Sequence, residues 1–198
     1  TNYVKRCVGL PGDSLEVRNG YVYINGKQNV LPERAKLQFS YMIETRNGPF
    51  NNYQLASRYN ITDFPQYNQD RSVSYFPAIT DEDLNKFKNH PNIKSITPLK
   101  EEKGKRDPNI FPQNPDYDWN NDFFGPLYIP QAGTTIDINL NVLPLYKRVL
   151  TAYEGNTLDV QGNQILINGE VATTYTFKKD YYWMMGDNRH NSQDARAW

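Results

Sequence analysis

A β-hairpin signature near the start of the chain constrains its fold more than any other feature. Asn19-Gly20 lies between two segments in which apolar and polar residues alternate, and Asn-Gly is the pair that a two-residue hairpin turn prefers. The pattern recurs once, because residues 156–170 align with residues 13–27. The two copies end on Asn25-Gly26 and Asn168-Gly169. Two copies are too few for a stacked repeat array, so we predict two similar hairpins in one β domain.

The composition agrees with a β-rich chain and excludes several classes of protein. With 198 residues, the chain suffices for one domain with a sizeable core, or for a core and a smaller inserted domain. Its 15 Tyr, 13 Pro and mean hydropathy of −0.79 favour short strands and turns over long helices. Lys+Arg and Asp+Glu are both 22, so the zero net charge indicates no nucleic-acid partner.

The sequence contains no apolar run long enough to span a membrane, and no N-terminal targeting pattern is visible. Its one cysteine, Cys7, excludes an internal disulfide framework, so cysteine usage does not identify the compartment.

The middle of the chain, residues 31–122, differs in amino-acid composition from the two ends. It is rich in Tyr, Asn, Gln, Pro and charged residues. Within it, residues 36–45 favour a strand, and Thr80 followed by Asp83 predicts the start of one helix. We therefore treat 31–122 as an inserted, irregular α+β region whose role cannot be inferred from its residues.

The remaining segments have the alternating pattern of strands. Residues 123–130 return to apolar sequence, and residues 134–141 alternate again. We predict a mainly β fold, in which residues 1–30 and 123–198 form a core of antiparallel hairpins.

Two polar motifs stand at opposite ends of the chain. Lys5 lies in an apolar, strand-like run that closes on the turn Leu10-Pro11-Gly12-Asp13. Alternation places Lys5 and Cys7 on one face of this strand, with Val4, Arg6 and Val8 on the other. The aromatic segment 181–185 leads into the second motif, Met185-Gly186-Asp187-Asn188-Arg189-His190-Asn191-Ser192-Gln193-Asp194-Ala195-Arg196. Taken alone, the first motif also fits a solvated edge-strand lysine, and the second fits an ordinary turn.

Together the two motifs resemble those of type I signal peptidases (leader peptidases), membrane-anchored serine proteases with a Ser/Lys catalytic dyad. Residues Lys5 to Asp13 match the family's lysine motif, roughly Lys-Arg-x-x-Gly-x-Pro-Gly-Asp. The matches to the family's last motif are Gly186, Asp187, Asn188, Arg189, Ser192, Asp194 and Arg196. The departures are Ala195, where the family usually has serine, and His190, where an acid is common. The segment between the motifs resembles the family only loosely, although family members carry a variable insertion there.

The resemblance implies a signal-peptidase-like β core and a role for each matching residue. Lys5 would be the general base, because a lysine amine that burial keeps neutral can activate a serine hydroxyl. Ser192 would orient that amine, so we predict a distance of about 2.7–3.2 Å between Lys5 Nζ and Ser192 Oγ. Asp194 is expected to pair with Arg196 and hold the Ser192 loop, and Asp187 and Arg189 are expected to brace it from the other side. Asn188 belongs to the same motif and is expected to support the site. Arg6 would face away from Lys5 and anchor the strand.

A second Lys-Arg pair, Lys147-Arg148, raises the question of which lysine is catalytic. Lys147 is not followed by Gly-x-Pro-Gly-Asp. The family motif therefore selects Lys5, and we predict that Lys147 is a solvated strand residue.

The implied reaction is removal of signal peptides from exported preproteins, on the extracytoplasmic side of the cell membrane. The family's nucleophile lies in a Ser-x-x-Pro motif before the lysine, and no serine precedes Lys5 here. Ser95-Ile96-Thr97-Pro98 has the required letters but lies downstream, in the inserted region. We therefore expect a soluble fragment that carries the base without the nucleophile and is inactive alone, with membrane attachment through a segment absent from this sequence.

Two alternatives remain open. A non-catalytic, β-rich binding module with a signal-peptidase-like fold would also lack the nucleophile. A self-cleaving, repressor-type Ser/Lys peptidase is disfavoured by the zero net charge, the lack of a DNA-reading motif and the long final motif.

No metal or cofactor is expected. His90 and His190 have no cysteine or second histidine at ligand spacing. His190 as the base of a Ser-His pair and Cys7 as a nucleophile are weaker interpretations than the Lys5 dyad, because a lone strand cysteine is more often a small buried apolar residue.

Overall fold

The computed structural model describes residues 4–197, which form a mainly β fold with few helices, as predicted. No helix within these residues has the length and apolarity needed to cross a bilayer. The contacts divide the chain into two compact units. The first comprises Thr1–Lys5, Val30–Glu101 and Gly186–Gln193, and the second comprises Arg6–Asn29, Glu102–Met185 and Asp194–Trp198.

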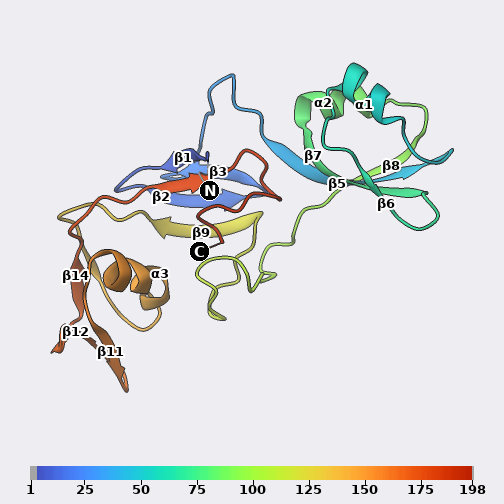
Figure 1. The fold of residues 1–198 in the computed structure, drawn as a ribbon. Helices are drawn as coiled ribbons and strands as arrows, with labels where there is room; N and C mark the ends of the chain where they lie inside the picture. Colours follow the sequence, from blue (N-terminus) through green and yellow to red (C-terminus); the bar gives the residue numbers. More distant parts are fainter. Residues whose placement is uncertain (1–3, 198) are drawn as a thin grey trace. The chain divides into compact units, whose positions relative to one another are not determined.

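An antiparallel sheet forms the frame of the first unit (Figure 1). Its strand order is β6-β7-β5-β8, so that β5 pairs with β7 on one side and with β8 on the other. The elements of this unit are β5 (Gln38–Thr45), α1 (Asn52–Tyr59), β6 (Gln66–Tyr67), β7 (Val73–Thr80), α2 (Asp81–Phe87) and β8 (Ile93–Pro98). The strand predicted near residues 36–45 is thereby confirmed as β5.

Capping and aromatic packing explain the helices of this unit. Thr80 caps α2 as predicted, because its Oγ1 accepts a hydrogen bond from the Asp83 backbone N–H at 3.0 Å. Phe87, at the end of α2, is buried, and its ring packs edge-to-face on the Phe50 ring with 5.1 Å between the ring centroids. Helix α1 was not predicted, because it is short and buries only Leu55.

Four small sheets and one helical segment make up the described part of the second unit. The four-stranded sheet has the order β4-β3-β2-β9, and its strands are β2 (Ser14–Arg18), β3 (Tyr21–Ile24), β4 (Lys27–Gln28) and β9 (Phe123–Tyr128). The three-stranded sheet contains β11 (Leu158–Gln161), β12 (Gln164–Ile167) and β13 (Glu170–Val171). The two-stranded sheets pair β1 (Arg6–Gly9) with β15 (Trp183–Met185), and β10 (Thr135–Asp137) with β14 (Thr174–Thr176). Helix α3 (Leu143–Arg148) continues into η1 (Val149–Tyr153), a π-helical turn.

Both copies of the repeated hairpin are present. They are the antiparallel pairs β2–β3 and β11–β12. Asn25 and Asn168 occupy equivalent left-handed positions, with φ of 51° and 54°. Each side chain accepts a hydrogen bond from the backbone where the first strand begins, Asn25 from Ser14 N at 2.9 Å and Asn168 from Thr157 N at 3.0 Å. The same local chemistry therefore closes both hairpins.

The segment around Lys147 is helical, so the prediction that Lys147 is a strand residue was wrong. Leu143, Tyr146 and Leu150 are buried at helical spacing, and Pro144 stands in the first turn, where proline is tolerated. The strand predicted for residues 134–141 is confirmed only over β10.

Residues 102–122 have their contacts in the second unit, whereas the sequence placed them with the inserted region. Asn120 illustrates this: its Nδ2 donates to the carbonyls of Glu102 and Lys105, and its Oδ1 accepts from the N–H of Phe123, which begins β9. A division by contacts identifies compact units, but it does not test which segments fold independently. The division into a core of 1–30 and 123–198 with an insertion at 31–122 therefore stays a prediction.

Candidate active site

Lys5 and Ser192 are hydrogen-bonded partners in the first unit. Lys5 Nζ lies 2.8 Å from Ser192 Oγ, although 187 positions separate the two residues. Both side chains are half-buried. The predicted distance between these atoms is thus confirmed, and a lysine amine is held against a serine hydroxyl.

In the sequence, Lys5 and Gly186 each adjoin one strand of an antiparallel pair. β1 and β15 are antiparallel, and Arg6 of β1 lies opposite Met185 of β15. The next residues along the two strands are Lys5 and Gly186, and Gly186 opens the loop that carries Ser192. Gly186 matches the family's last motif, but the sequence did not indicate its role. A Cβ built on it would lie 2.6 Å from Ser192 Cβ and 3.5 Å from Lys5 Nζ.

The loop before Ser192 is held by its backbone to the start of β5. Gln38 N donates to Asp187 O at 2.9 Å, and Arg189 N donates to Gln38 O at 3.0 Å. Asn188 lies opposite Gln38 in a parallel bridge, and its side-chain oxygen accepts from Asn191 N at 3.1 Å. Arg189 is 1% exposed. The sequence identified Asp187, Asn188 and Arg189 as supporting residues, but it contained no signal for their attachment to Gln38.

Asp194 and Arg196 form a buried ion pair in the second unit, as the sequence predicted. Arg196 Nη2 lies 2.8 Å from Asp194 Oδ2, and Arg196 Nε lies 2.9 Å from Asp194 Oδ1. Each residue is 1% exposed. Such a bidentate pair fixes the backbone that it spans, because neither charge can be left buried without the other.

Arg6 begins β1, opposite Met185, and is half-buried. The predicted alternation along this segment was only partly correct. Val4 is 95% exposed and Val8 is 6% exposed, although the pattern placed both on one face. Lys5 precedes the strand, and the register shifts between Cys7 and Gly9, so simple alternation does not hold. The anchoring role of Arg6 stays a prediction.

The metal-ligand, cysteine and histidine alternatives can each be compared with the described residues. No group of three or more His, Cys, Asp or Glu within residues 4–197 is arranged to hold a metal ion. Cys7 is exposed on β1. His190 is used structurally, because its Nδ1 accepts a hydrogen bond from Ser40 N at 3.1 Å.

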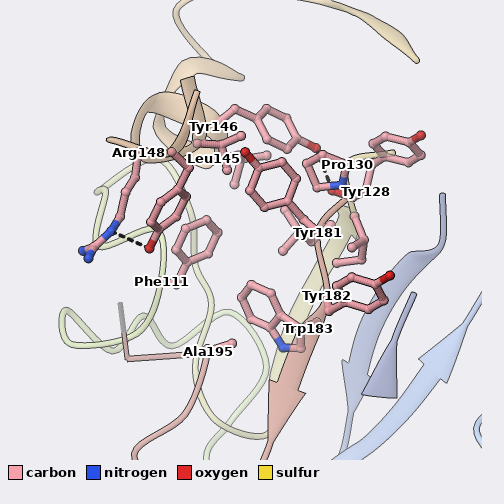
Figure 2. Close-up of a pocket in the computed structure, with 14 residues that line it drawn as sticks. Phe111, Tyr128, Pro130, Leu145, Tyr146, Arg148, Tyr181, Tyr182, Trp183 and Ala195 are labelled. Carbon is pink, nitrogen blue, oxygen red and sulfur yellow. Dashed lines mark hydrogen bonds between the residues drawn. The ribbon is translucent and has the colours of Figure 1, made fainter. Parts of the chain in front are cut away.

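An aromatic pocket of about 160 Å³ lies within the second unit (Figure 2). The Tyr146 hydroxyl donates to Tyr128 O at 3.0 Å, and burial raises the pKa of Tyr146. At the rim, Arg148 Nε donates to Tyr153 Oη at 3.1 Å. Ala195 contributes to the lining, so the side chain that departs from the family motif faces apolar rings here. The lining residues are Phe111, Leu127, Tyr128, Ile129, Pro130, Leu145, Tyr146, Arg148, Val149, Tyr153, Tyr181, Tyr182, Trp183 and Ala195.

The comparison with sequence families agrees with the lysine motif. Residues 1–82 match the family described as "Signal peptidase, peptidase S26". This range includes the lysine motif and, in the first unit, the strands β5 to β7. The resemblance to bacterial type I signal peptidases is therefore confirmed.

Curated relatives point the same way over shorter segments. "Signal peptidase I S" of Bacillus subtilis (strain 168) is 59% identical over 27 residues, which are 14% of this chain and 15% of the relative. "Signal peptidase I P" of Bacillus subtilis subsp. natto is 54% identical over 28 residues, again 14% and 15%. "Signal peptidase IB" of Staphylococcus aureus (strain Mu50 / ATCC 700699) is 29% identical over 72 residues, 36% of this chain and 33% of the relative. The chain thus matches one third or less of the length of these relatives, and no solved structure gives a significant match.

Proposed function

We propose that this protein belongs to the machinery that removes signal peptides from exported preproteins at the extracytoplasmic face of the cell membrane. Lys5 is the general base of a Ser/Lys dyad. The observation that carries this proposal is the hydrogen bond of 2.8 Å between Lys5 Nζ and Ser192 Oγ. The signal-peptidase family match over residues 1–82 supports it independently.

The chemistry requires a base because a serine hydroxyl is a weak nucleophile. A neutral lysine amine has one lone pair, which takes the proton from the attacking hydroxyl and later passes it to the leaving amine. The N–H groups of the same amine remain free to donate to Ser192 Oγ. Ser192 therefore aims the lone pair of Lys5 without competing for it.

The remaining motif residues act through the backbone around Ser192. Gln38 binds the chain at Asp187 and Arg189, ahead of Ser192. The Asp194–Arg196 pair fixes the chain that follows Ser192. These residues support the site without contacting the reacting atoms, and Asn188 and Arg6 belong to the same supporting group.

Ser192 is the partner of the base, and the nucleophile is a different serine, which the family motif places before the lysine, where this sequence has none. Ser40 and Ser74 are buried, and their hydroxyls donate to the carbonyls of Pro77 and Ile43, each at 2.9 Å. Ser95, in the Ser-x-x-Pro sequence, is part of β8, where it lies opposite Glu44. The 198-residue chain alone is therefore expected to cleave no signal peptide, and cleavage that depends on Lys5 would contradict this assignment.

The decisive test uses the full product of the gene that encodes this chain. Its cleavage of a preprotein is compared with that of the variants Lys5→Ala and Lys147→Ala. Lys147 is the matched control, because it begins the second Lys-Arg pair but lies on α3. Loss of a general base lowers turnover by roughly 10²- to 10⁴-fold. The cleavage rate of Lys5→Ala should therefore fall by this factor, while the cleavage rate of Lys147→Ala should stay near that of the wild type. Full activity in Lys5→Ala would refute the proposal, and binding of signal peptides without any cleavage would favour a β-rich binding module instead.

A further inference from the structure

The loop that carries Ser192 runs along β5 of the first unit and makes a contact at each step. Asp187 and Arg189 are bonded to Gln38 through the backbone. Two residues further along β5, the Ser40 N–H donates to His190 Nδ1 at 3.1 Å. The His190 ring also packs edge-on against Phe39, with 5.6 Å between the ring centroids.

Asn191 completes the attachment immediately before Ser192. Its Nδ2 donates to Pro77 O at 2.7 Å and to Ser40 Oγ at 3.2 Å. The Tyr75 hydroxyl donates to its Oδ1 at 3.3 Å. The residue that bonds Lys5 therefore directly follows two side chains that bind β5 and β7.

From this geometry we infer that His190 is a positioning residue, which holds Ser192 against Lys5 through the hydrogen-bond acceptor on its imidazole. The Ser40 N–H is the donor, and His190 Nδ1 accepts its hydrogen. Loss of that acceptor would leave the loop without its bond to the Ser40 backbone, one residue before Asn191 and two before Ser192. The inference rests on the proposed function in one respect, because loosening Ser192 affects catalysis only if Lys5 is the base.

The test uses two NMR readouts in the 198-residue chain. The first readout is hydrogen exchange of the Ser40 amide relative to the Thr45 amide, which donates to Ser72 O at the other end of β5. The second is the ¹³Cε and ¹⁵Nζ chemical shifts of Lys5. His190→Phe keeps an aromatic ring beside Phe39 but has no acceptor, whereas His190→Asn keeps a side-chain acceptor.

In the wild type, the Ser40 amide should be protected from exchange, and the Lys5 shifts are the reference for an amine bonded to Ser192. In His190→Phe the Ser40 amide should exchange roughly two- to tenfold faster, the factor that corresponds to a hydrogen bond of typical net strength, and the Lys5 shifts should move. His190→Asn should restore the protection of Ser40 and return the Lys5 shifts toward the wild-type values. Equal Ser40 protection in wild type and His190→Phe, or Lys5 shifts that do not change in His190→Phe, would overturn the inference. A lack of peptidase activity in the full gene product leaves both NMR readouts intact and counts against the proposed function alone.

Discussion

Gly186 lies so close to Ser192 that no side chain fits between them. A Cβ at Gly186 would collide with Ser192 Oγ and would lie 2.6 Å from Ser192 Cβ. The same Cβ would lie 3.5 Å from Lys5 Nζ, so the glycine leaves room for both partners of the hydrogen bond. Glycine is needed here for close approach, since its lack of a Cβ lets Ser192 reach Lys5.

We predict that Gly186→Ala breaks the bond between Lys5 and Ser192. The new methyl group must displace the Ser192 side chain, so the Lys5 ¹⁵Nζ shift should move to that of the Ser192→Ala variant. Gly133→Ala is the control, because Gly133 has a left-handed φ of 80° but open space around its Cβ position. Its backbone strain should lower stability by about 1 kcal/mol and leave the Lys5 resonance unchanged. A Gly186→Ala protein with a wild-type Lys5 resonance would contradict the close-approach argument.

Ser192→Ala should lower kcat of the full gene product with little change in KM. Ser192 contacts the base and not the substrate, so its removal weakens only interactions that act in the transition state. The Lys5 amine becomes charged as it takes the proton in the transition state. A hydrogen bond to a charged group has a net value of about 1.5–3 kcal/mol, which corresponds to a loss of roughly 10- to 100-fold. Ser95→Ala, in the downstream Ser-x-x-Pro sequence on β8, should retain wild-type kinetics. If Ser95→Ala abolishes cleavage and Ser192→Ala does not, the two serines have been assigned incorrectly.

Arg196→Met should destabilise the protein strongly. The change leaves Asp194 as a buried charge without its bidentate partner, and breaking a buried pair in this way costs about 3–5 kcal/mol. Arg18→Met is the matched control, because Arg18 pairs with Glu16 at 2.7 Å but its side chain is 49% exposed. An exposed pair contributes little to stability, because water and salt screen its charges. Urea unfolding of the two variants compares these losses directly, and equal midpoints would show that the Asp194–Arg196 pair is dispensable.

Alkaline pH should destabilise the second unit through Tyr175. Burial first, and then the hydrogen bond to Glu154, raise the pKa of Tyr175 from 10.0 to about 12. Because the folded-state pKa lies above the ordinary value, the stabilising contribution is fully present below pH 10 and is lost as the pH rises through about 12. Urea unfolding at pH 8, 10 and 12 and phenolate absorbance should both report this loss.

Two variants separate the causes of the Tyr175 shift. Glu154→Gln should bring the pKa of Tyr175 part of the way back toward 10, because burial remains after the charge is removed. Tyr175→Phe should remove the step near pH 12 altogether. A Tyr175 that titrates near 10 in the wild type would show that the side chain is open to water.

Local chemistry in the sequence determined the hairpins, one helix start and the two motifs. The turns require residues that tolerate a left-handed backbone, and the sequence has them at Asn19-Gly20 and at Asn25 and Asn168, the matching positions of the two hairpins. At the start of α2, Thr80 binds the N–H of Asp83, only three residues away. Such signals need only neighbouring residues, so they are readable without the fold. Weaker local patterns were missed, as in α1, which buries only Leu55, and in α3, where the Lys147-Arg148 pair suggested a strand.

Tertiary structure alone decided how the Ser192 loop is held. Gln38 and Pro77 contact the loop through backbone groups, and Ser40 does so through its N–H as well as its hydroxyl. Backbone carbonyls occur in every residue type and N–H groups in all but proline, so these contacts left no signal in the sequence. The same is true of Gly186, whose importance depends on the position of Ser192 in space. The sequence by itself therefore determined which residues the two motifs contain, and it predicted that Lys5 pairs with Ser192. The fold determined which backbone supports that pairing, because hydrogen bonds between distant segments depend on which strands meet.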